Sequence, residues 1–179
     1  MWSRPILPRE EAQPVAESLQ LLLTTLIDLS LVAKQAHWNL FGDDFLATHE
    51  KLDEVVASAR NFGDLVAERI VKLGFPADGR VDTVAARTPL PAMPDGFETV
   101  RTMLTETCDR LKIVIDATRE CRAAVADLDP MTEDLTIEIA REIETHFWML
   151  QAMEGRSPAE PNQGSAANGQ TSHRETVTV

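Results

Sequence analysis

Apolar residues recur at intervals of three and four along four long stretches of this chain, and this pattern constrains the fold more than any other feature. An interval that averages about 3.6 residues places the apolar side chains on one face of an α-helix. We therefore expect long helices over 11–41, 46–74, 95–127 and 130–154. Because each helix alone would expose its apolar face, the sequence predicts an all-α four-helix bundle.

The segments around and within this bundle differ in composition. Residues 1–10 contain two prolines and no periodicity, so we expect an irregular N-terminal arm before a bundle over 11–154. Residues 155–179 are rich in Ser, Gly, Asn, Gln and Pro, which predicts a disordered tail. The connection 75–95 holds four prolines and is long for a link between two antiparallel helices. Within it, Asp82 can cap a short extra helix.

Charge and cysteine content indicate the compartment. The formal charge of −12 opposes binding to DNA phosphates, which requires Lys and Arg. Polar residues interrupt the most apolar stretch, 19–33, so we expect neither a signal peptide nor a membrane span. Cys108 and Cys121 would lie about 20 Å apart along one helix, too far for a disulfide within the chain. These features predict a cytoplasmic protein with buried thiols, associated with the nucleoid only if it binds DNA.

Two histidines and three acidic residues have the spacing of metal ligands. Four of them share one face of the second predicted helix: His49, Asp53, Asp64 and Glu68. Along the helix axis, however, Asp53 and Asp64 would lie roughly 16 Å apart, several times the length of a metal–ligand bond. One chain therefore cannot bring all four to a single ion.

The turn after the first helix can fold His37 back beside His49. This would form one half-site of His37, His49 and Asp53, and Asp64 with Glu68 would form the other. A two-fold partner with an antiparallel second helix would bring complementary half-sites together, twice in each dimer. Imidazole and carboxylate ligands without thiolate suit Fe(II), Mn or Zn, with positions left open for water or an oxidant.

Each of these residues also has an ordinary alternative. A lone His on an amphipathic helix usually faces solvent or is hydrogen-bonded in the core, and an Asp-x-x-x-Glu pair usually forms a solvated face. Residues 49–53 differ from the zinc-protease motif H-E-x-x-H at Asp53, and no further His follows nearby. Glu142 and His146 lie four residues apart, but we leave this pair outside the predicted site. Lys34 can either hydrogen-bond near the site or reach solvent.

Residues 34–69 contain K-x-x-H-W-N-x-x-G-x-x-F-x-x-x-H-x-x-x-D followed by D-x-x-A-E-R. This motif resembles the ferroxidase signature of the Dps family (DNA-binding protein from starved cells), and the helix pattern extends the resemblance to about residue 154. The resemblance implies a ferritin-like bundle with a short helix in the linker, assembled as a hollow dodecamer. It also implies a ferroxidase centre at the two-fold interface. Trp38 is expected to be partly in the core, and the resemblance places it near that centre as an electron donor.

The resemblance further implies that acidic residues before and within the fourth helix line three-fold pores through which iron enters. Asp134 matches best, and Asp129 and Glu133 match more weakly. The alternative is that acids at this helix N-terminus serve as caps and dipole partners. DNA-binding members of the family use lysine-rich tails, and neither end of this chain has one.

These observations predict a ferroxidase that oxidises Fe(II), with hydrogen peroxide or dioxygen as oxidant, and stores ferric mineral against oxidative stress. Zn or Mn is the alternative metal at the same site. A nucleoid DNA-binding stress protein with a structural or inactive metal site is the alternative function. In a third interpretation, zinc only holds the dimer together.

Overall fold

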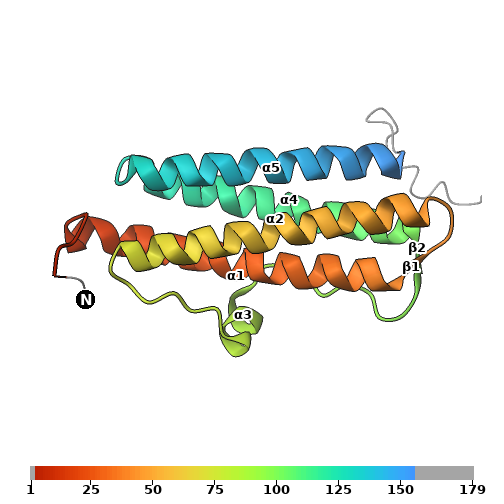
Figure 1. Ribbon diagram of the computed structural model, residues 1–179, viewed down its shortest axis with the longest axis horizontal. Helices are drawn as coiled ribbons and strands as arrows, with labels where there is room; N and C mark the ends of the chain where they lie inside the picture. Colours follow the sequence, from red (N-terminus) through yellow and green to blue (C-terminus); the bar gives the residue numbers. More distant parts are fainter. Residues whose placement is uncertain (1–2, 156–179) are drawn as a thin grey trace, which may run out of the picture.

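Four long helices form a bundle in the computed structural model, which describes residues 3–155 (Figure 1). They are α1 (Arg9–Asn39), α2 (Phe45–Lys72), α4 (Val100–Val125) and α5 (Pro130–Glu154), and a short α3 (Val81–Arg87) lies in the linker. The helix α1 packs mainly against α2, and α4 mainly against α5. The predicted all-α class is confirmed. The predicted tail, 155–179, lies outside the described residues except for Gly155.

The bundle core is made of aliphatic side chains from all four long helices. Burial of each such side chain contributes about 2 kcal/mol, so tertiary packing rather than helix propensity holds these helices. The largest fully buried side chains include Leu19, Leu22, Leu26, Leu29, Leu52, Ile70, Met103, Leu111, Ile139, Ile143 and Leu150. Cys108 and Cys121 are both buried, and burial raises the pKa of the Cys121 thiol to about 12.

Two short strands alter the predicted helix ends. The strand β1 (Leu40–Phe41) pairs in parallel with β2 (Glu98–Thr99), so α1 ends before residue 41 and α4 begins after residue 95. Phe97 lies in the predicted helix 95–127 but precedes α4, and it is 77% exposed. At the other end of α1, the carbonyl of Pro8 accepts bonds from two amides of the first turn, and the helix starts two residues earlier than predicted.

The linker crosses the length of the bundle. Because β1 directly precedes α2 and β2 directly precedes α4, the parallel pairing makes both helices start at the same end (Figure 1). The expectation that the linker joins antiparallel helices is therefore wrong, and the crossover explains its length. Gln20 fixes the linker by two hydrogen bonds with the backbone of Asp78, of 2.8 and 2.9 Å. The extra helix is present, but Arg80 rather than Asp82 is its N-cap.

The first helix, α1, is long and apolar enough to cross a membrane by composition alone, and it is the only such helix among the described residues. Most of its apolar window, 61%, is buried inside the bundle. A helix packed on several sides in a bundle core has this composition for that reason.

Candidate metal centre

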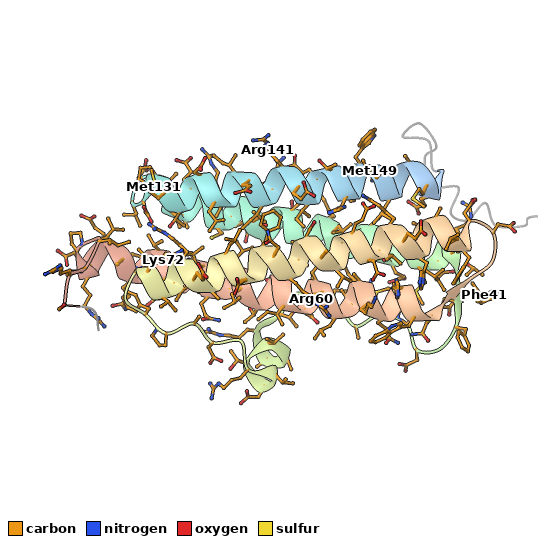
Figure 2. The ribbon with its side chains drawn as sticks, viewed as in Figure 1. Phe41, Arg60, Lys72, Met131, Arg141 and Met149 are labelled. Atoms are coloured by element: carbon orange, nitrogen blue, oxygen red, sulfur yellow. The ribbon has the colours of Figure 1, made fainter. Side chains whose placement is uncertain are left out.

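The loop between α1 and α2 folds the last turn of α1 against the start of α2. Gly42 has a φ of 110° and Asp44 a φ of 60°, and both angles lie in the left-handed region where glycine is favoured. This reversal places β1 and the two helix ends at one end of the bundle, marked by Phe41 in Figure 2. Residues twelve positions apart, His37 and His49, therefore lie in contact.

His37 and His49 fix each other through their backbones. The Nδ1 of His37 lies 2.9 Å from the carbonyl oxygen of His49, and the Nδ1 of His49 lies 3.0 Å from the carbonyl oxygen of His37. The two rings stack with centroids 3.6 Å apart. Because a carbonyl only accepts, each Nδ1 carries the proton and donates it, and each Nε2 keeps a lone pair. Both imidazoles are thus held in the tautomer that can bind a metal through Nε2.

Asp53 completes this cluster from one turn beyond His49 on α2. Its Oδ1 lies 3.4 Å from the Nδ1 of His37 and accepts a hydrogen bond from the ammonium of Lys34. That bond, together with the nearby positive charge, holds the pKa of the Asp53 carboxyl below its usual value. Half of the carboxyl side chain is exposed, so an ion can reach it from solvent. The cluster therefore combines two imidazoles with one ionised carboxylate.

Lys34 contacts both sides of the cluster. Its Nζ lies 3.0 Å from the Nε2 of His37 while it is bonded to Asp53, so of the two possibilities for this side chain the structure has the one near the site. The sequence pattern could not decide this, because the lysine stem is long enough to reach either way. A positive charge already lies between an imidazole and a carboxylate, the position that a cation bound by both would occupy.

Asp64 and Glu68 are not part of this cluster. Both are exposed near the opposite end of α2, where Glu68 accepts a 2.9 Å ion pair from Lys72, labelled in Figure 2. Within residues 3–155, no three His, Cys, Asp or Glu side chains of the single chain are grouped to hold a metal ion. The structure thus brings together His37, His49 and Asp53 and keeps the other pair apart, as the axial distance requires.

Trp38 lies outside the core. It is 64% exposed, so the expectation of partial core burial is wrong for the single chain. It follows the buried His37 by one residue, and a step of about 100° turns it away from the bundle. Other large apolar side chains are exposed around the same turn: Phe41, Phe45 and Leu46. The ring of Phe45 also stacks on His49 at 5.2 Å. Such an exposed apolar group beside a polar cluster is typical of a surface covered by another chain.

The three acids proposed for a pore have different environments. Asp129 is 2% exposed and is the N-cap of α5, where it accepts bonds from the amide of Met131 and from Arg69. It therefore has the capping role that was the alternative for this position, and its carboxylate does not face solvent. Glu133 is paired with Arg122 at 2.6 Å. Asp134, the fifth residue of α5, is exposed and is the best placed of the three to face the expected pore.

Arg69 has a structural role that the sequence pattern did not reveal. Its guanidinium donates to Asp129 at 2.5 Å and to the hydroxyl of Thr132 at 2.9 Å, and so joins α2 to the start of α5. Arg69 lies 60 positions before Asp129 and 63 positions before Thr132 in the sequence. In the sequence, Arg69 stood out only by its position after Glu68 in the motif. That position did not predict which residue it would bond to.

Comparison with known families defines the class of protein. Residues 16–156 match the ferritin-like domain family, and this match covers all of the bundle except the first seven residues of α1. The chain is therefore a ferritin-like protein, and the ferritin-like bundle that the resemblance implied is confirmed.

Individual relatives define the family within that class. The DNA protection during starvation protein of Agrobacterium fabrum is 36% identical over 150 residues, which are 82% of this chain and 91% of that protein. The structure of Dps from Microbacterium arborescens in the high iron form aligns with a TM-score of 0.81 at 33% identity, over 86% of this chain and all of that one. Mycobacterium smegmatis Dps aligns with a TM-score of 0.84 at 30% identity, over 96% and 98% of the two chains. The chain belongs to the Dps family.

Proposed function

We propose that this protein is a ferroxidase and iron store whose catalytic centre is shared between two chains. The observation that carries the proposal is the stacked pair His37 and His49, whose Nδ1 atoms are bonded to backbone carbonyls, beside the ionised Asp53. The donor set suits iron, and a Dps relative with the same fold has been solved in a high iron form. Iron is the substrate of this reaction and not a resident cofactor.

Each half-site has a separate task in the proposed centre. His37, His49 and Asp53 bind Fe(II) from one chain, and Asp64 and Glu68 of the partner subunit close the site from the other. A two-fold axis that makes two α2 helices antiparallel brings these groups together twice. The exposed Trp38, Phe41 and Leu46 would be covered in the same contact, which excludes water from the rim.

The proposed reaction is a two-electron reduction of peroxide. Two Fe(II) ions give one electron each to one H2O2, and its O–O bond breaks. With two further water molecules the products are two FeO(OH) and four protons, so atoms and charge balance. Because one molecule of peroxide takes both electrons, no hydroxyl radical is released. The carboxylates of the centre stabilise the higher charge of Fe(III), and Trp38 at its edge can supply an electron when a single iron is oxidised.

Lys34 must move when iron enters. Its ammonium bonds to Asp53 and lies 3.0 Å from the Nε2 of His37, and like charges would repel at that distance. Before iron binds, the lysine neutralises and orients the carboxylate. We therefore assign Lys34 as a positioning residue that gives way to the substrate.

The charge of the assembled protein favours storage of iron rather than binding of DNA. At −12 per chain, a shell of twelve copies attracts Fe(II), and the exposed Asp134 would line its entry path. The name of the Agrobacterium relative refers to DNA protection. In this protein we propose that protection follows from the removal of Fe(II) and peroxide in the cytoplasm, without contact with DNA.

The first test combines activity and particle size in one sample. Anaerobic loading with Fe(II) and then addition of H2O2 should give ferric absorbance at least about tenfold faster than in protein-free buffer. Light scattering of the same sample should give a particle near twelve chains that keeps the ferric product in solution. Oxidation at the buffer rate, with tight binding of Zn(II) instead, would overturn the proposal in favour of a zinc-held oligomer. Retardation of plasmid DNA at low salt by an inactive particle would favour the DNA-binding alternative.

A further inference from the structure

A second cluster of potential ligands lies between α2 and α5, away from the proposed ferroxidase centre. It consists of Ser58 from α2 and of Glu142 and His146 from α5, on the part of α5 between Arg141 and Met149 in Figure 2. The Oγ of Ser58 lies 2.9 Å from the Nε2 of His146 and 3.4 Å from the Oε1 of Glu142. The Nε2 and Oε1 atoms are 3.4 Å apart. Three donor atoms from three side chains thus form one small triangle.

The size of this triangle matches one face of a metal coordination sphere. With metal–ligand bonds of about 2.1 Å, neighbouring ligand atoms lie roughly 3.4 Å apart around a tetrahedral ion and roughly 3.0 Å apart around an octahedral one. The three observed separations fall in or next to this range without any movement of the helices. Glu142 and His146 share one face of α5 because they lie four residues apart, and Ser58 of α2 faces both of them.

His146 is a buried side chain whose hydrogen bonds are incomplete. The residue is 3% exposed, and its Nδ1 has no hydrogen-bond partner among the described residues. If the Ser58 hydroxyl donates to Nε2, the buried Nδ1 carries a proton that has no acceptor. If Nε2 donates to Ser58 instead, the buried Nδ1 has a lone pair that receives no hydrogen bond. Neither tautomer satisfies both nitrogens. Because no group in the described part of the chain fixes Nδ1, the ring is not committed to one tautomer, and it can present the lone pair of Nε2 towards Ser58 and Glu142.

The charges around His146 favour a cation. Burial lowers the pKa of the imidazole, so the ring is a neutral ligand. The charges that act on it are, in order of size, those of Lys51, Glu142 and Glu54. Lys51 is bound to Glu54 at 2.6 Å, which leaves the carboxylate of Glu142 as the unbalanced charge. This carboxylate is about half exposed, so an ion can arrive from solvent on that side.

We propose that His146, Glu142 and Ser58 form a site for one divalent transition-metal ion within a single chain. The Nε2 of His146 and a carboxylate oxygen of Glu142 are the two primary ligands, the hydroxyl of Ser58 is the third, and water completes the sphere. An imidazole ligand selects borderline ions such as Zn(II), Co(II) or Fe(II) over Mg(II) or Ca(II). The site is complete without a partner subunit and does not depend on ferroxidase activity.

Cobalt(II) tests the site, because its visible absorption bands change when nitrogen enters the coordination sphere. The background variant is His37→Gln with His49→Gln, which leaves only His146 and His173 of the four histidines. Anaerobic titration of this assembled variant should show about one Co(II) per chain with bands different from those of aqueous Co(II). No oxidant is present, so the result is independent of the proposed iron oxidation.

Three further substitutions in the same background assign the ligands. His146→Gln and Glu142→Gln should each weaken Co(II) binding at least about tenfold and remove the new bands. Glu142 is half exposed, so Glu142→Gln keeps the fold even if the buried histidine cannot be replaced. The matched control is Glu144→Gln on the same helix. The carboxylate of Glu144 pairs with Arg119, so this variant should bind Co(II) as the background does. Equal affinity in Glu142→Gln and the background, or bands of aqueous Co(II) throughout, would overturn the proposal.

Discussion

Two variants that are each inactive are expected to regain about one quarter of the wild-type ferroxidase rate when their chains are combined in one oligomer. The first is His49→Gln with Asp53→Asn, and the second is Asp64→Asn with Glu68→Gln. In a dimer that contains one chain of each kind, one centre has both altered halves and the other has none. Random pairing gives half mixed dimers, so about one quarter of all centres are intact.

The measurement is peroxide-driven Fe(II) oxidation after co-refolding of the two variants in equal amounts. Simple mixing of the assembled variants, without exchange of subunits, is the control and should give no recovery. All four replacements keep side-chain size, and Asp53, Asp64 and Glu68 are exposed, so assembly should not change. If the two variants are verified to assemble together and no ferroxidase activity is recovered, the two half-sites do not meet between chains.

Replacing Arg69 by methionine is expected to lower the free energy of unfolding by about 3 kcal/mol at neutral pH. The carboxylate of Asp129 is almost fully buried and would lose its charged partner. The loss would also release α2 from the start of α5, because Arg69 bonds to Thr132 as well. Urea unfolding followed by circular dichroism, at equal oligomeric state, measures the difference. Arg119→Met is the control, because its pair with Glu144 is exposed and should have little effect.

The pH dependence of this loss identifies its cause. Burial favours the neutral form of Asp129, but hydrogen bonds from Arg69 and Thr132 and the charge of Arg69 outweigh it, so the pKa of the carboxyl lies below its usual value. The stabilisation is therefore present above the usual pKa of the carboxyl and is lost as the pH falls through the lowered one. Without Arg69, the effect of burial on the Asp129 carboxyl is no longer outweighed. Protonation at low pH then removes the unpaired charge. The difference between variant and wild type should shrink below about pH 4, and a difference independent of pH would point to lost packing instead.

The sequence alone was sufficient for the helices and for the composition of the candidate centre. Long apolar repeats specify helices because they depend on residues three and four apart, which the sequence shows directly. The division of the ligands into two half-sites also follows from the rise of one helix, because the distance between Asp53 and Asp64 is set by local geometry. Helix ends were less predictable, since Leu40–Phe41 and Glu98–Thr99 form strands only by pairing with each other.

The tertiary structure decided which partner each polar side chain has. Lys34 bonds to Asp53, Arg69 to Asp129, and His146 to Ser58, across 19, 60 and 88 positions. Asp129 became a buried cap rather than a pore acid for the same reason, because its partner comes from α2. Such pairs depend on how the helices pack and have no periodic signal. The sequence thus determined the helices, their apolar faces and the residue types of the proposed centre, whereas only the packed bundle determined which charges are neutralised and which polar side chains meet.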